Sequence, residues 1–223
     1  MRRKKVFNYE ELKLYQVHVE NKATGFMTVH DIIHGKFKQL ITYVKQSFDT
    51  PNDSVATSIF MRRYGFFIAA QLFLKAHHKI WDGPLENIYL VENEGGITFN
   101  LDGKYVRAAQ ENDLEMIVEK YGHNVVQRMS MLGHLSKITL WENIWGYVQW
   151  MYSQLELEQG KKDLKTLLDD AVWHPHTRTS MFRKFLAGQK FEEAAKNYKR
   201  ITCCLLKELP ATTKCPYCPH LKK

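Results

Sequence analysis

The sequence predicts a mainly α-helical fold with a small antiparallel β meander, an α+β arrangement in a single globular domain that carries a cysteine-bearing C-terminal segment. Apolar residues recur at helical intervals through most of the chain. Only near residues 86–108 do β-branched residues stand between glycine-containing turns. All four cysteines of the 223 residues lie after position 202. With 44% hydrophobic residues, the chain can bury a core without disulfides.

The N-terminal half contains one weak and two strong predictions of secondary structure. Residues 12–20 alternate weakly between apolar and polar positions, which indicates a strand. Residues 29–48 carry one apolar stripe and predict a helix that is weakened near Gly35. Asn52 is among the candidate N-caps of the next segment, residues 55–78. Because its middle is apolar on nearly all sides, this segment predicts a central buried helix.

The second half predicts further strands and then only helices. Residues 86–108 indicate a three-strand meander. Helical spacing returns afterwards, and Pro175 enforces a break between the last two helices. The predicted helices lie within residues 112–136, 138–160, 161–172 and 178–187. No linker separates residues 1–110 from residues 111–223, so we expect these N-terminal and C-terminal parts to form one compact unit.

The charge balance favours an anionic partner. Lysine and arginine outnumber aspartate and glutamate by 32 to 24, a formal net charge of +8. The sequence shows no helix-turn-helix, arginine-rich or aromatic RNA-binding motif, which speaks against nucleic acid. It also lacks an apolar run of bilayer length and the apolar stretch of a signal peptide. We therefore expect a cytoplasmic protein with no membrane span and at most peripheral membrane contact.

The cysteines form the spacing Cys-Cys-x10-Cys-x2-Cys, with Cys203, Cys204, Cys215 and Cys218 as its members. A structural zinc ion suits the second pair, but adjacent side chains in the first pair diverge and close awkwardly on one ion. A [2Fe–2S] cluster offers two thiolate positions on each of two irons and tolerates that divergence. Disulfides or free thiols are the third alternative, and a reducing cytoplasm disfavours the disulfides.

The motif resembles that of the ferric-siderophore reductase family typified by FhuF, which holds a [2Fe–2S] cluster with this spacing. The lead-in YKRITCCL is also similar, and TLWENIWGYVQW and FRKFL look like the helical body of that family. The strong similarity covers the cluster-binding segment, residues 198–223, and a weaker one reaches back to about residue 138. The resemblance implies that Cys203, Cys204, Cys215 and Cys218 ligate the cluster, with no catalytic residue beyond it.

The activity implied by this resemblance is the reduction of a ferric siderophore. One electron passes from the cluster to chelated Fe(III), and Fe(II) is released for iron acquisition. The expected chelators are of the hydroxamate or citrate type, whose hard oxygens prefer Fe(III). Since the sequence has no nucleotide-binding fingerprint, an external donor such as a ferredoxin or a reductase is expected. Two alternatives stay open: a zinc-stabilised nucleic-acid-binding module and an iron–sulfur redox sensor.

Several basic residues are candidates for supporting roles. Arg200, Lys199 and Lys214 flank the cysteines and could tune a cluster or contact the chelate, whereas a solvated basic face is the simpler interpretation for the lysines. Arg62 and Arg63 could grip a carboxylate, although a helix-boundary role is simpler.

Aromatic residues crowd the helix predicted within residues 138–160. Their helical spacing favours core packing over a ligand pocket. The residues concerned are Trp141, Trp145, Tyr147, Trp150 and Tyr152.

Overall fold

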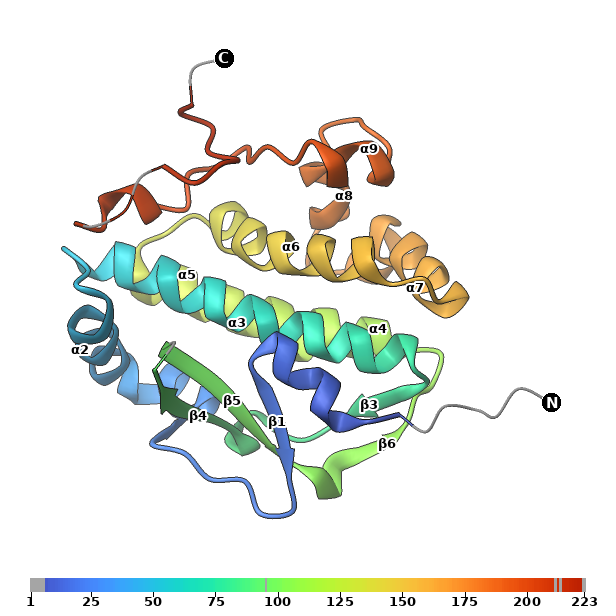
Figure 1. Ribbon diagram of the computed structural model, residues 1–223, viewed down its shortest axis with the longest axis horizontal. Helices are drawn as coiled ribbons and strands as arrows, with labels where there is room; N and C mark the ends of the chain where they lie inside the picture. Colours follow the sequence, from blue (N-terminus) through green and yellow to red (C-terminus); the bar gives the residue numbers. More distant parts are fainter. Residues whose placement is uncertain (1–6, 95, 211, 213, 222–223) are drawn as a thin grey trace.

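The computed structural model describes residues 7–94, 96–210, 212 and 214–221. Helices dominate and small sheets pack against them, which confirms the predicted α+β class (Figure 1). Within the described residues the helices are α1 (Val29–Asp31), α2 (Phe37–Phe48), α3 (Asp53–Ala76), α4 (Asp113–Met116), α5 (Asn124–Gly133), α6 (Lys137–Gln154), α7 (Glu158–Leu168), α8 (Met181–Phe185) and α9 (Phe191–Lys196). The strands are β1 (Val17–Glu20), β2 (Met27–Thr28), β3 (Lys79–Trp81), β4 (Ile88–Asn93), β5 (Gly96–Asp102) and β6 (Val106–Ala108).

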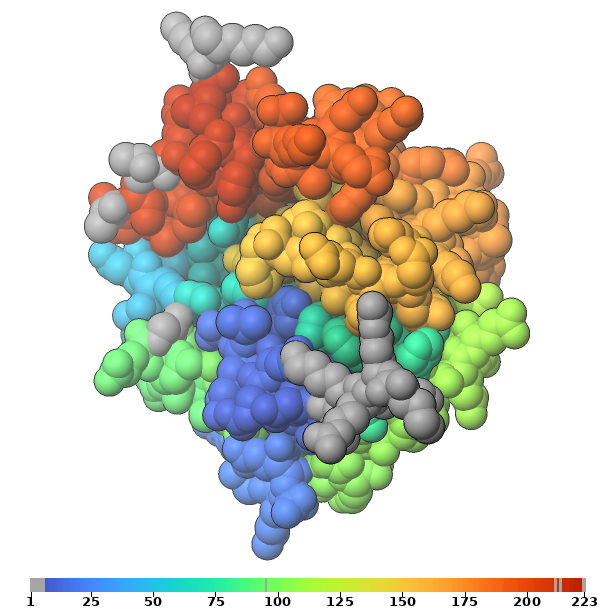
Figure 2. Space-filling view, turned by 45° about the vertical axis from the view of Figure 1, so that its right-hand side comes forward, coloured from blue at the N-terminus to red at the C-terminus, as the bar shows by residue number. Residues whose placement is uncertain are grey.

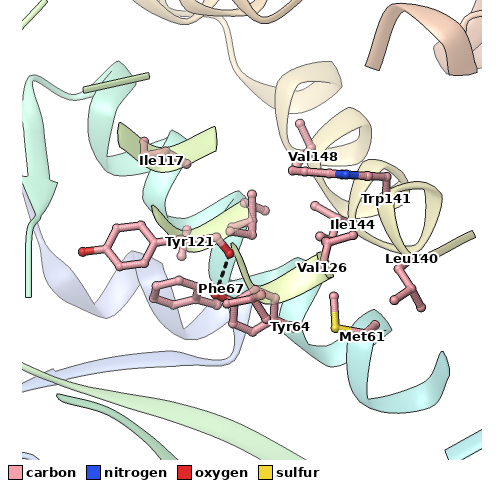
Figure 3. Packing of buried hydrophobic residues seen from close by; sticks show 14 of the residues in the cluster. Met61, Tyr64, Phe67, Ile117, Tyr121, Val126, Leu140, Trp141, Ile144 and Val148 are labelled. Atoms are coloured by element: carbon pink, nitrogen blue, oxygen red, sulfur yellow. Dashed lines mark hydrogen bonds between the residues drawn. The ribbon is translucent and has the colours of Figure 1, made fainter. Parts of the chain in front are cut away.

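Helix α3 runs through the centre of the molecule, as its apolar composition predicts. The Asn52 side chain caps it by accepting the Val55 N–H at 3.0 Å. The sheet that contains β1, β4 and β5 lies on one side of α3, and α6 lies on the other (Figure 1). Figure 3 shows α3 side chains packed toward α5 and α6, with the Tyr64 hydroxyl donating to the Tyr121 carbonyl at 2.8 Å. One hydrophobic core joins both halves of the chain, so the single-domain prediction is confirmed.

Helices α3 and α6 pack closely at Gly65. A Cβ added there would lie 2.8 Å from Tyr147 Cδ2 and 3.1 Å from the Asn143 carbonyl oxygen. By contrast, a Cβ at Gly146 of α6 would meet nothing nearer than Tyr198, at 3.9 Å. The two helices therefore need a glycine at the first position and merely tolerate one at the second.

This difference predicts opposite effects of alanine at the two positions. Gly65→Ala is expected to lower the free energy of unfolding by about 1–3 kcal/mol, because the added methyl forces the helices apart. Gly146→Ala is expected to leave it unchanged or raise it by up to about 1 kcal/mol through helix propensity. Urea denaturation of both variants measures the contrast. Equal stability of the two would contradict the close packing at Gly65.

The strand pairing differs from the predicted meander in its last member. Strands β4 and β5 form the expected antiparallel hairpin in a sheet of order β1-β5-β4-β2, in which β1 is parallel to β5. Strand β6 instead pairs with β3 in a separate sheet. The buried indole of Trp81 in β3 donates to the Asp102 carbonyl at 2.9 Å, where β5 ends. This long-range contact redirects the chain, and local turn patterns could not reveal it.

The remaining predictions agree with the structure in type, and their boundaries shift. Only the second half of residues 12–20 is a strand, because a 3₁₀ helix occupies Tyr9–Tyr15. The helix expected over residues 29–48 is present and is interrupted by non-helical backbone angles at Gly35. Short helix α9 escaped prediction, since six residues with a single buried position give no periodic signal.

The C-terminal segment lies on the outer surface beside α6. Beyond α9, the described residues contain only one helical turn, Leu206–Glu208, and otherwise irregular backbone (Figure 1). The red C-terminal residues are visible on the molecular surface in Figure 2. In the described part of the chain, no helix is long and apolar enough to cross a bilayer.

Candidate metal centre

The cysteines gather in one place. Cys204, Cys215 and Cys218 are buried and pack together with Leu206 and Tyr217. Cys203 is half-buried, and none of the four thiols forms a disulfide. The tail thus folds back on itself and brings Cys215 and Cys218 to Cys204.

Backbone hydrogen bonds hold the two cysteine pairs next to each other. The Arg200 N–H donates to the Tyr217 carbonyl at 2.9 Å, which joins the segment before the first pair to the loop of the second. Inside that loop, the Cys218 N–H donates to the Cys215 carbonyl at 3.0 Å. Cys215 and Cys218 of this turn are both buried and pack with Cys204 of the first pair.

The surroundings of Cys204 favour its thiolate form. The Leu205 N–H donates to Cys203 Sγ at 3.4 Å. Burial tends to raise the pKa of Cys204, but the Leu206 N–H and the charges of Arg200 and Arg62 outweigh it and lower the pKa below its usual value. Burial and the neighbouring Cys204 raise the pKa of Cys215 to about 12. The Cys215 thiol therefore donates a hydrogen bond to the Cys204 sulfur, which its surroundings shift toward thiolate.

A buried carboxylate, Glu142 of α6, anchors the cysteine segment. It is fully buried, and its oxygens accept the N–H groups of Ile201 at 2.7 Å and Thr202 at 2.8 Å. The Thr202 hydroxyl adds a short hydrogen bond to the same carboxylate. The Arg200 guanidinium, 3% exposed, lies 3.5 Å from it and balances its charge.

A second chain of hydrogen bonds links α6 and α3 to the cysteines. Arg200 donates to the Asn143 side-chain oxygen at 2.7 Å, and the Asn143 amide donates to the Ser58 hydroxyl at 2.9 Å. That hydroxyl donates to the Cys204 carbonyl at 2.7 Å. The position of Cys204 is therefore set by two helices of the body as well as by its own segment.

The flanking cations predicted from sequence differ in their positions. Arg200 is buried beside the thiols, whereas Lys199 and Lys214 are exposed, and the Lys214 amine donates to the His220 carbonyl at 3.1 Å. Exposed Lys207 lies near Cys203 and Cys218 and was not singled out as a candidate. Sequence inspection also missed Glu142, although a carboxylate within the apolar stretch LWENIW is a signal of a buried partner.

A cavity of about 520 Å³ opens beside the cysteine loop. Arg62 and Arg200 line it, and Tyr217, which stands between Cys215 and Cys218 in the sequence, forms part of its wall. The aromatic residues of α6 fall into two groups, one in the core and one in the cavity wall. Trp141, Trp145 and Tyr152 are buried in the core, whereas Tyr147 and Trp150 line the cavity.

The four thiols are the candidate ligands of a metal centre. Among residues 7–94, 96–210, 212 and 214–221, no three His, Cys, Asp or Glu side chains are arranged to hold a metal ion. The cysteines lie instead as two nearby pairs. A [2Fe–2S] cluster takes two thiolates on each iron, and the N–H groups and guanidinium charges beside the sulfurs suit its negative charge.

Comparison with known proteins adds no relative: no family model, curated protein or solved structure matches this chain. The resemblance to the ferric-siderophore reductases therefore depends on the cysteine spacing and its flanking residues.

Proposed function

We propose that this chain is a cytoplasmic iron–sulfur oxidoreductase that reduces chelated Fe(III), as in ferric-siderophore reduction. The observation that carries the proposal is the grouping of the cysteine thiols beside two arginines at the wall of a cavity. Cys203, Cys204, Cys215 and Cys218 would hold a [2Fe–2S] cluster. When bound, such a cluster supplies one electron at a time, which is the difference between Fe(III) and Fe(II).

The two arginines compensate the negative charge of the thiolates. Arg200 and Arg62 both lower the pKa of Cys204, so their positive charges act at the sulfur. Positive charge near the sulfurs would also ease the addition of an electron to the cluster. Arg200 is held in place by Glu142 and Asn143 and therefore cannot turn away into solvent.

The chelate and the electron donor would approach this centre from the surface. A ferric hydroxamate or citrate carries anionic oxygens, which the cavity arginines attract. Hard oxygens hold Fe(II) less well, so reduction releases the metal. Exposed Lys199, Lys207 and Lys214 surround the cysteines and would steer an acidic donor such as a ferredoxin or a reductase.

Anaerobic purification followed by a visible spectrum tests the cofactor. We expect a coloured protein with about two irons and two sulfides per chain. After reduction with dithionite, adding a ferric hydroxamate or ferric citrate should restore the oxidised spectrum. A ferrous-specific dye in the same cuvette should detect one Fe(II) for each cluster that is reoxidised.

Two other outcomes would replace the proposal. A colourless protein with one tightly bound zinc would indicate the zinc-stabilised module, and a nucleic-acid binding assay would follow. A stable cluster that no ferric chelate reoxidises would indicate a redox sensor.

A further inference from the structure

The cavity beside the cysteine loop has the composition of a binding site. It lies between α3, α6 and the C-terminal segment, and its volume of about 520 Å³ is in the usual range for small-molecule pockets. Its wall contains one cationic side chain without a carboxylate partner among the described residues, two polar side chains without hydrogen-bond partners in this part of the chain, and several aromatic rings. Each of these groups bears on the chemistry of the ligand.

The cationic group is Arg62. Arg200 also lines the cavity, but Glu142 balances its charge. Arg62 is half-buried and contacts the Tyr217 hydroxyl, and among the described residues no carboxylate forms an ion pair with it. The nearby phenols and the Cys204 sulfur raise the pKa of Arg62, so it stays charged. A partly desolvated cation without a carboxylate favours an anionic ligand.

Two polar side chains in the wall lack partners. Gln149 is 3% exposed, and within the described structure neither its amide nitrogen nor its amide oxygen is hydrogen-bonded. The buried hydroxyl of Tyr198 is likewise unpaired in this part of the chain. Buried polar groups are nearly always hydrogen-bonded in native proteins. Both residues line the cavity, so a polar ligand there would satisfy them.

The remaining wall is aromatic. The Phe66 and Tyr147 rings lie 4.0 Å apart, and those of Tyr198 and Tyr217 lie 5.2 Å apart. Trp150, which is 43% exposed, adds a further ring to the wall. Flat rings on several sides favour a flat ligand that stacks on them.

We propose that this cavity binds a planar aromatic anion of the phenolate or catecholate class. Building on the proposed function, that anion is the aryl arm of the chelator that carries Fe(III). Hydroxamate and citrate chelators present anionic oxygens to Arg62 but no ring to the aromatic wall. Because Tyr217 lies between Cys215 and Cys218, a ligand stacked on it sits next to the thiols.

Gallium complexes test the binding separately from electron transfer, because Ga(III) copies the charge and geometry of Fe(III) but is not reduced. The purified full-length protein would be titrated with Ga(III)–2,3-dihydroxybenzoate and with Ga(III)–acetohydroxamate, with calorimetry and Trp fluorescence as readouts. We expect the aryl complex to bind at least about tenfold more tightly and to quench the fluorescence. Equal affinities, or tighter binding of the hydroxamate, would overturn the inference.

Matched variants locate the site. Gly146→Leu projects a side chain into the cavity and should weaken binding of the aryl complex at least about tenfold, whereas Thr166→Leu, at an exposed position of α7 outside the cavity, should bind normally. Arg62→Gln should also weaken binding. Its control is Arg63→Gln, since Arg63 on the same helix packs over the Phe48 ring instead. Denaturation midpoints of all four variants verify that they are folded. Unchanged binding in both Gly146→Leu and Arg62→Gln would refute the location.

The outcome separates this inference from the proposed function. A colourless protein that still binds the gallium aryl complex would support the aryl-binding site and refute the reductase function. A coloured protein that is reoxidised by ferric hydroxamate but does not bind aryl complexes would support the reductase and refute the aryl-binding site.

Discussion

Replacing Glu142 by alanine is expected to lower the free energy of unfolding by about 3–5 kcal/mol. The substitution leaves the Arg200 charge buried without its counter-ion and removes the acceptor of the Ile201 and Thr202 N–H groups. The C-terminal segment should then detach from α6, because this carboxylate is its main polar anchor. Urea denaturation measures the loss of stability. The rate at which a thiol reagent modifies the cysteines measures the detachment, and we expect that rate to rise.

Two further variants make this result specific. Glu193→Ala removes an exposed carboxylate from α9 and should change the stability by no more than about 0.5 kcal/mol. Combining Glu142→Leu with Arg200→Met removes both buried charges and should recover part of the stability lost in Glu142→Ala. If Glu142→Ala unfolds at the wild-type urea concentration and its thiols react no faster, the anchoring role is wrong.

Serine in place of Cys203 or Cys218 is expected to abolish or severely weaken cluster binding. A serine hydroxyl is nearly isosteric with the thiol but stays protonated at neutral pH, so it replaces a thiolate ligand poorly. We expect the iron content and the visible absorption to fall to a small fraction of the wild-type values, while the far-ultraviolet circular dichroism stays unchanged. Iron analysis of anaerobically purified protein provides the measurement.

Lys214→Ala is the matched control, because Lys214 adjoins Cys215 in the sequence but its side chain is exposed and contacts a backbone carbonyl. It should retain the full iron content. Full retention of iron in both cysteine variants would refute the ligand assignment.

Local patterns were sufficient for the elements that depend on local physics. Helix α3 could be predicted because its apolar residues and the Asn52 cap act within a few residues of each other. The cysteine spacing likewise predicted that the four thiols act together as ligands, and the structure brings Cys204, Cys215 and Cys218 into one buried cluster. The pairing of β6 with β3 was missed because the buried Trp81 indole that redirects the chain bonds a residue distant in sequence.

The candidate site shows the same division. Spacing and residue type alone identified the thiols and Arg200 as a group, since they are neighbours in the chain. Arg62 and Gln149 joined that group only through the packing of α3 against α6, which places them around one cavity. Glu142 joined it through the docking of the C-terminal segment on α6. Burial made Glu142 the counter-ion of Arg200, and packing placed Arg62 and Gln149 in the cavity wall. Periodicity cannot reveal burial of this kind, because it arises from contacts across the fold rather than along the chain.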